Sequence, residues 1–310
     1  MKKKLCFAVL LLCATAGYAM PIASSARSMV PSEVQQLIGV DYRALKDSPT
    51  AQALKQQVLP DNLKELETAL KGIGIDADHD LDQLTFASFR TEKRGIQTIG
   101  VAAGSFSAKA VLKKLKLKKI AATKYGSASV YPMGDGLVMT FLDDNTLAFG
   151  TTASLHSALD TRDGKRAALD SNPVMTDQMA SVDSSPLWSV LDQQGTQAGM
   201  LSAIGDASKV GDFDSLKKRI LASHYTMNFQ NGVNFDYSVL TADSMTAATL
   251  STIVKGVILY KKLGASPIEK IAYDSTTVDS DSSNVQVHFK SDDQKFQSLM
   301  HSPLFAAVSH

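Results

Sequence analysis

The clearest fold signal in the sequence is the segment His224-Tyr-Thr-Met-Asn-Phe-Gln-Asn-Gly-Val-Asn-Phe-Asp-Tyr-Ser-Val-Leu-Thr241. Hydrophobic and polar residues alternate on both sides of Asn231-Gly232, and a period of two predicts strands with one apolar face. Asn-Gly supplies the two positive-φ positions that a two-residue hairpin turn requires. We therefore predict an antiparallel hairpin with strands over 224–230 and 233–241.

Helical and strand periodicities alternate on both sides of this hairpin. Before it, the pattern predicts a strand over 187–192 and helices over 194–204 and 213–222; after it, a helix over 244–263, strands over 271–278 and 285–290, and a helix over 292–300. A similar order occurs roughly 140 to 150 residues earlier, which is typical of an internal repeat. That earlier run comprises a strand over 37–42, helices that begin at Pro49 and Asp61, a hairpin over 84–90 and 96–103, a helix after Ser105, strands over 127–133, 137–142 and 146–150, and a helix over 153–159.

The fold class predicted from this order is α+β, with two similar halves that arose by duplication. The halves cover 33–163 and 186–310, and the Asp-, Ser- and Gly-rich segment 164–185 links them. Because strands that alternate apolar and polar residues bury one side, each half is expected to be an antiparallel sheet with helices packed on one face.

The N-terminus has the pattern of a secretory signal peptide. Three lysines precede an apolar run from Leu5 to Cys13, and small residues extend to Ala19. We predict a signal over 1–19, a flexible leader over 20–32, and export to the periplasm or the extracellular space. A cut after Ala16 also fits, whereas lipid attachment at Cys13 is disfavoured because Leu12 precedes it. Removal of the signal leaves no cysteine in the chain.

The charge balance and the hydropathy of the chain indicate which classes of partner it can have. Without the three lysines of the signal, 29 Lys and Arg stand against 31 Asp and Glu. This balance predicts no nucleic-acid partner. No segment after the signal has the roughly 20 apolar residues that span a bilayer. The partners left open are a small molecule and an envelope protein.

A lysine-rich helix is the most distinctive charged feature. Lys109, Lys113 and Lys116 lie opposite an apolar stripe and are candidates for contact with a partner or an anionic surface. The alternative is an ordinary solvated helix face.

No catalytic, metal-binding or cofactor-binding constellation is recognisable. Asp76, Asp78 and Asp80 begin a calcium-loop pattern, but the required glycine and glutamate are absent, so a capped turn is the favoured interpretation. His224 and His288 lie on the polar sides of their strands, where they either meet across the sheet or face solvent. We predict no catalytic residue, no metal and no cofactor, and the ligand-binding residues stay unknown.

Two stretches resemble uncharacterised exported proteins of the acidobacterial and planctomycete kind. They are Thr140-Phe-Leu-Asp-Asp-Asn-Thr-Leu-Ala-Phe-Gly150 with the helix 153–160, and Gly74-Ile-Asp with Leu84-Thr-Phe86. The resemblance implies export and a repeated α+β unit, and it carries no functional residue across.

These observations favour an exported, non-enzymatic binding or interaction protein that uses the cleft between its halves or an open sheet face. The alternative hypothesis is an envelope-associated structural or assembly factor. A third hypothesis is a hydrolase with an unrecognised site. A binder should contain a sizeable apolar cavity, and a hydrolase should contain ionisable groups with shifted pKa values in one cleft.

Overall fold

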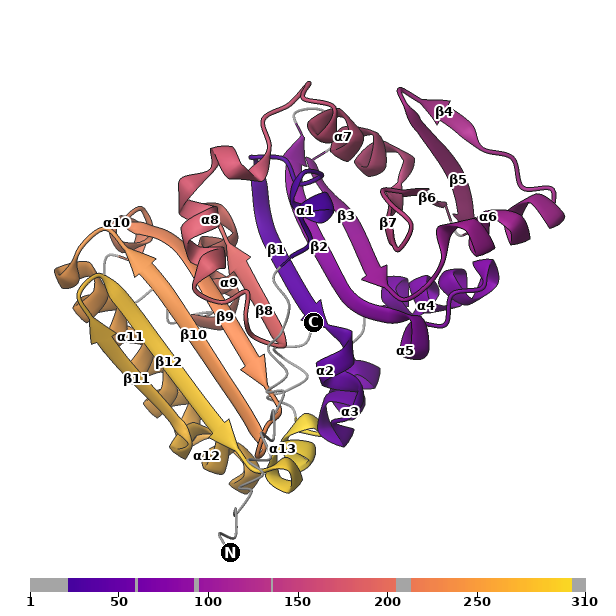
Figure 1. Ribbon diagram of the computed structural model, residues 1–310. Helices are drawn as coiled ribbons and strands as arrows, with labels where there is room; N and C mark the ends of the chain where they lie inside the picture. The colour runs from indigo at the N-terminus through magenta and orange to yellow at the C-terminus, as the bar shows by residue number, and fades with distance from the viewer. Residues whose placement is uncertain (1–21, 59–60, 92–94, 135, 205–212, 303–310) are drawn as a thin grey trace, which may run out of the picture.

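The computed structural model describes residues 22–58, 61–91, 95–134, 136–204 and 213–302. The predicted signal peptide lies outside the described residues. The described strands form one sheet of 12 strands in the order β11-β12-β10-β9-β8-β1-β2-β3-β7-β6-β5-β4, and every neighbouring pair is antiparallel (Figure 1). The predicted α+β class is confirmed.

The elements follow one another in two runs. The first run contains α1 (Ser24–Arg27), β1 (Val34–Asp41), α2 (Tyr42–Lys46), α3 (Pro49–Val58), α4 (Asp61–Ile73), α5 (Ala77–Asp80), β2 (Leu81–Thr91), β3 (Gly95–Gly104), α6 (Ala108–Leu117), β4 (Thr123–Tyr125), β5 (Ala128–Gly134), β6 (Leu137–Phe141), β7 (Thr146–Thr151), α7 (Thr152–Arg162), the 3-10 helix η1 (Leu169–Ser171) and α8 (Pro173–Ala180). The second contains β8 (Leu187–Leu191), α9 (Gln193–Ile204), α10 (Phe213–Lys217), β9 (Ile220–Asn228), β10 (Val233–Thr241), α11 (Ser244–Leu263), α12 (Pro267–Asp274), β11 (Thr276–Asp281), β12 (Asn284–Ser291) and α13 (Asp293–Met300).

The two halves share this sheet instead of forming one sheet each. β1 pairs with β8, and Gly39 stands opposite Trp188 at the junction. The indole of Trp188 lies directly over Gly39, where a Cβ would be 2.3 Å from Cε2. Trp188, the only tryptophan of the sequence, is 2% exposed and belongs to the core. A single sheet results because β1 and β8, the first strands of the two halves, pair with one another along their edges.

Helices cover the two faces of the sheet unequally. One face, which we call the cavity face, includes Ile38, Val40 and Leu84, and α2, α3, α4, α6, α9, α11, α12 and α13 cover it. The opposite face includes Leu37 and Val190, and it is covered in the middle by α1, α7 and α8. In Figure 1, α8 lies in front of the sheet and α11 behind it. The first half is therefore covered on both faces, which differs from the one-sided packing expected from the sequence.

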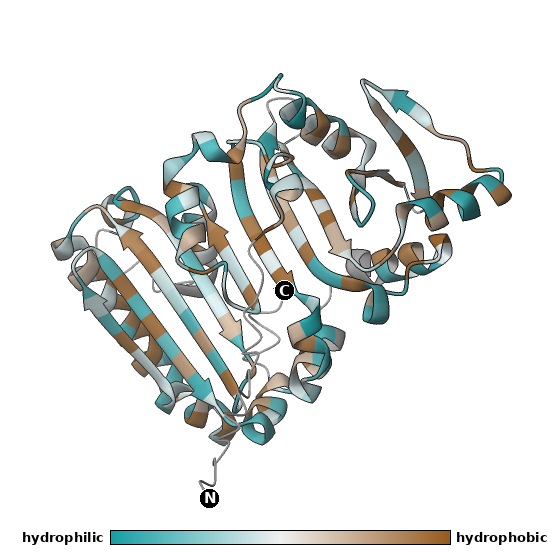
Figure 2. Ribbon diagram, viewed as in Figure 1, coloured by the Kyte–Doolittle hydropathy of each residue, from teal (hydrophilic) through white to brown (hydrophobic). Residues whose placement is uncertain are grey.

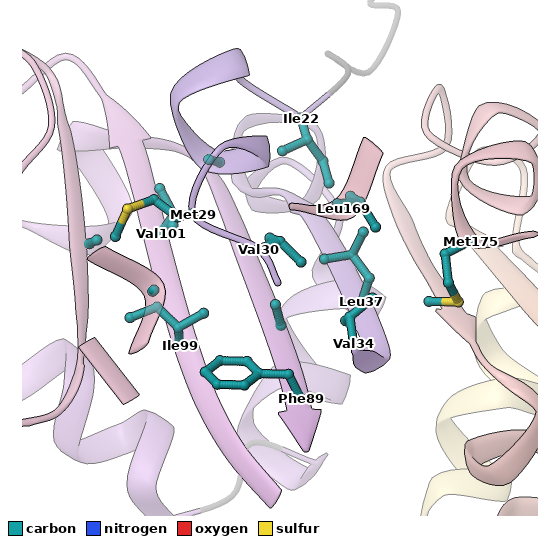
Figure 3. Close-up of a cluster of buried hydrophobic side chains, with 14 of the residues drawn as sticks. Ile22, Met29, Val30, Val34, Leu37, Phe89, Ile99, Val101, Leu169 and Met175 are labelled. Atoms are coloured by element: carbon teal, nitrogen blue, oxygen red, sulfur yellow. The ribbon is translucent and has the colours of Figure 1, made fainter. Parts of the chain in front are cut away.

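The hydrophobic cluster on the opposite face includes segments that the sequence analysis placed outside the two halves. Met29 and Val30, from the expected flexible leader, are 0% and 1% exposed and pack with Leu37 and Phe89 (Figure 3). Met175 of α8, from the expected linker, is 1% exposed in the same cluster. Both segments are polar in composition, but most of their large described apolar side chains are buried, namely Ile22, Met29, Val30, Leu169, Met175, Met179 and Val182.

The predicted hairpin with strands over 224–230 and 233–241 is confirmed. β9 and β10 pair antiparallel across Asn231 and Gly232, whose φ angles are 58° and 95°. Hydrophilic and hydrophobic residues alternate visibly along β10 and β12 (Figure 2).

Several elements differ from the sequence-based expectation. The strand expected over 271–278 is the helix α12 up to Asp274, followed by β11. The Ser266 backbone N–H donates to Glu269 Oε2 at 2.8 Å there, and Pro267 is at the first helical position, a start signal that outweighs the β-branched residues downstream. The helix expected over 213–222 ends at Lys217 because 220–228 enters the sheet, and the edge strand β4 was not expected.

Candidate functional site

A cavity of about 380 Å³ lies between the cavity face and the helices α2, α3 and α4. This volume is within the range of about 300 to 1,000 Å³ that small-molecule sites usually have. The side chains that line it are mostly apolar: Ile38, Val40, Tyr42, Leu45, Ala51, Gln52, Leu54, Lys55, Leu66, Glu67, Leu70, Leu81, Leu84, Phe86, Leu187 and Phe229. Leu187 and Phe229 belong to the second half, so the cavity reaches across the junction between the halves.

The floor of the cavity is a set of sheet residues that the helices do not fully cover. Ile38, Val40 and Phe86 stand on β1 and β2 in the middle of the sheet, yet each is only partly buried. A well-packed core leaves few voids larger than a water molecule. The helical layer is therefore separated from the sheet here, and apolar surface stays available to a ligand.

One corner of the cavity is polar. The Tyr42 hydroxyl donates to Glu67 Oε1 at 2.6 Å, and Lys55 Nζ lies 2.5 Å from the same oxygen. Lys55 Nζ also lies 3.3 Å from Asp78 Oδ1 and 4.8 Å from the centroid of the Tyr42 ring. The three residues come from α2, α3 and α4, so this polar corner joins all three helices of the cavity wall.

The pKa values of Tyr42 and Lys55 in the polar corner are both raised. Burial and the hydrogen bond to Glu67 raise the pKa of Tyr42 to about 12. Burial lowers the pKa of Lys55, but its contacts with Glu67 and Tyr42 outweigh burial, and the resulting pKa lies above the ordinary value. At neutral pH both groups are hydrogen-bond donors, so neither acts as a general base. The corner is suited to bind and orient a polar group.

The sequence-predicted surface residues Lys109, Lys113 and Lys116 lie on α6, where all three are exposed. They are not among the residues that line the cavity. Two other lysines of this stretch have a structural role: Lys114 Nζ donates to the Gly74 carbonyl at 3.3 Å and Lys118 Nζ to the Gly72 carbonyl at 2.6 Å. These bonds satisfy carbonyls at the C-terminal end of α4. Contact between α6 and a partner stays a prediction.

The other sequence candidates have local partners. Asp76 caps α5, since its carboxylate accepts from the Asp78 backbone N–H at 3.0 Å, which supports the capped-turn interpretation. His224 and His288 lie on the opposite face with β10 between them, so they do not meet. His224 Nδ1 is 2.7 Å from Gln178 Oε1 and His288 Nδ1 is 2.6 Å from Asp236 Oδ1. Among the described residues, no three His, Cys, Asp or Glu side chains are grouped as metal ligands.

Comparison with known proteins gives the fold and no family. No protein-family model matches the chain, and neither does any curated protein. The crystal structure of TP0453, a Treponema pallidum protein, is similar with a TM-score of 0.51 at 8% sequence identity. The match covers 92% of this chain and 97% of that one. At this identity the likeness shows a shared fold alone. The resemblance to exported acidobacterial and planctomycete proteins stays a prediction.

Sequence reasoning expected a cavity in a binding protein but named none of its residues, and it missed the polar corner. Tyr42, Lys55 and Glu67 lie on three consecutive short helices, where a lone tyrosine, lysine and glutamate give no motif. The available signal was the mixed character of α3: its inward side carries Leu54 and also Lys55, a charged residue next to the core.

Proposed function

We propose that this protein is an exported, non-enzymatic binding protein that holds a mainly apolar small molecule in the cavity between α2, α3, α4 and the sheet. The observation that carries the proposal is the unfilled apolar volume above Ile38, Val40 and Phe86, with one polar corner at its wall. Binding there removes apolar surface of both ligand and protein from water, which is the dominant favourable contribution in such sites.

The charges of the polar corner indicate which ligands fit. Lys55 and Glu67 neutralise one another, and Asp78 adds a negative charge beside them. Of the two carboxylates only Glu67 lines the cavity, so an anionic group there would meet the Glu67 carboxylate, whereas a neutral hydroxyl or carbonyl can bond to the corner without a charge penalty. We therefore propose a ligand with a long or bulky apolar part and an uncharged polar group.

Native mass spectrometry of the chain from residue 20 onwards, which keeps every described residue, tests the proposal. We expect an adduct that is lost on denaturation, or saturable binding of an environment-sensitive apolar dye by the emptied protein. Ala51→Phe places a ring in the cavity and should abolish either signal, because Ala51 lines it and is 4% exposed. Ala44→Phe, at an exposed position of α2, is the matched control and should bind as the unaltered chain does. Equal binding by both variants would refute the proposed site.

We also infer that the two halves arose by duplication. The support is their matching strand order: β1-β2-β3-β7 in the first half corresponds to β8-β9-β10-β12 in the second, with the last strand of each half beside the hairpin.

A further inference from the structure

The outward side of α11 is unusual for a surface helix. Its inward residues Ala247, Leu250 and Ser251 are buried against the sheet, and Val254 and Ile258 continue that stripe. The opposite stripe at helical spacing contains Gly256, Leu259, Tyr260 and Leu263, in place of the charged residues that the outer side of such a helix normally carries.

The C-terminal end of this stripe exposes large apolar side chains. Leu259, Tyr260 and Leu263 are 65%, 75% and 80% exposed, and together they form what we call the α11 patch. They line one shallow surface hollow with Lys262 and Lys270. Single exposed apolar residues are ordinary, but three in one hollow next to cations mark an interaction surface.

The charges around the α11 patch are positive. α11 contains three lysines and neither aspartate nor glutamate. Lys255 lies one helical turn before Leu259, and Lys270 comes from α12. The nearby acids have other roles: Asp274 pairs with Lys262, and the Glu269 carboxylate accepts from the Ser266 backbone N–H at 2.8 Å. The lysines at the C-terminal end of α11 also interact favourably with the helix dipole, but that role does not explain the exposed leucines.

We propose that the α11 patch docks on the surface of an anionic lipid bilayer, with Leu259, Tyr260 and Leu263 in the headgroup region and the lysines on lipid phosphates. Leucine and tyrosine next to lysine is the composition of helices that lie in the membrane interface. No described helix is long and apolar enough to cross a membrane, so α11 lies on the bilayer rather than through it.

A second copy of the chain fits the α11 patch less well. In a two-fold dimer the same patch faces itself, which would bring Lys255 and Lys270 of one copy towards those of the other. Like charges at an interface are unfavourable. An anionic lipid surface instead complements the lysines while it covers the apolar side chains.

Flotation with lipid vesicles tests the proposal on the chain from residue 20 onwards. We expect binding to vesicles of equal parts phosphatidylcholine and phosphatidylglycerol, and weak binding to phosphatidylcholine alone. Leu259→Gln with Leu263→Gln should lower the partition coefficient by about tenfold or more, since each leucine loses its apolar burial. Lys255→Gln with Lys270→Gln should lower it by about fivefold per lysine at low salt, and by less at high salt.

Matched controls lie on α6, a second lysine-rich helix. Leu117 is 75% exposed there, so Leu117→Gln removes a similarly exposed leucine and should leave vesicle binding unchanged. Lys109, Lys113 and Lys116 are the competing candidates for contact with an anionic surface, and their change to Gln should lower vesicle binding by less than the change of Lys255 and Lys270 does. Absence of binding to anionic vesicles, or equal losses in the α6 and α11 variants, would overturn the proposal. So would a concentration-dependent dimer that the α11 leucine variant dissociates, because the occupant would then be a second copy.

Discussion

Replacing Tyr42 by phenylalanine tests the polar corner of the cavity through protein stability. The change removes one hydroxyl and keeps the ring, which is 9% exposed. At pH 7 the variant loses the 2.6 Å hydrogen bond to Glu67. A bond to a charged acceptor contributes about 1.5 to 3 kcal/mol when buried, and the partial exposure of Glu67 reduces this to about 1 kcal/mol. Tyr42→Phe should therefore be slightly less stable than the unaltered chain.

At alkaline pH the order of stability should reverse. Tyr42 ionises near its ordinary value of 10.0 in the unfolded chain, whereas burial and Glu67 raise its pKa to about 12 in the folded chain. The stability that the neutral hydroxyl contributes is complete below pH 10 and is lost as the pH rises towards 12. The loss amounts to about 2.7 kcal/mol, because each pH unit between the two values costs about 1.36 kcal/mol. Tyr42→Phe lacks this ionisation and should be the more stable chain by about 1 to 2 kcal/mol at pH 12.

Urea unfolding followed by tryptophan fluorescence measures both effects. Trp188 is the only tryptophan and is 2% exposed, so its emission reports the unfolding of the shared sheet. Tyr260→Phe, at a ring 75% exposed on α11, is the matched control. The difference in unfolding free energy between the unaltered chain and Tyr42→Phe should change sign between pH 10 and 12. A difference that stays constant from pH 8 to 12 would refute the account of the polar corner.

Three glycine substitutions test the packing by urea unfolding. Gly39→Val should destabilise by about 1 to 3 kcal/mol through overpacking, because a Cβ would lie 2.3 Å from the Trp188 ring. Gly232→Ala should cost at least about 1 kcal/mol, since φ is 95° and the new Cβ would be 2.3 Å from the Ser291 carbonyl oxygen. Gly256→Ala, in the interior of α11 where a Cβ would meet no side chain or neighbouring segment within 4 Å, should stabilise by about 0.5 to 1 kcal/mol. A destabilised Gly256→Ala, or a neutral Gly39→Val, would show that the packing differs from the one described.

Local signals in the sequence predicted most of the elements, because they depend on residues close together in the chain. Ser48 and Pro49 begin α3 as expected, with the Ala51 backbone N–H donating to Ser48 Oγ at 3.2 Å. Asn231-Gly232 determines the hairpin of β9 and β10. Where two local signals compete, as at α12, the helix start signal outweighs strand propensity, and strand propensity depends strongly on context.

The sequence patterns did not predict which strands far apart in the chain pair with one another. β1 and β8 each have an apolar pattern that suits a sheet, but nothing in either segment states that they pair with one another. The contact between Gly39 and Trp188 that fits them together joins residues far apart in the chain. The cavity depends on the same pairing, since Leu187 and Phe229 reach its wall only because the halves share a sheet.

The cavity and the α11 patch belong to one helical layer. α11 packs on α12, α12 on α13 and α13 on α3, and the cluster that includes Leu54, Ala272 and Phe296 joins the last three. A row of helices on the cavity face thus connects the patch proposed to meet lipid with the helix that covers the cavity.

This arrangement predicts that ligand binding and vesicle binding are separable, while transfer of ligand from vesicles requires both. Ala51→Phe should float with anionic vesicles as the unaltered chain does, and Leu259→Gln with Leu263→Gln should bind a dissolved apolar dye normally. Only when the dye is supplied in vesicles should the leucine variant acquire it more slowly, by about tenfold, in proportion to its lost partition. Equal acquisition from vesicles by the leucine variant and the unaltered chain would mean that the α11 patch has no part in loading the cavity.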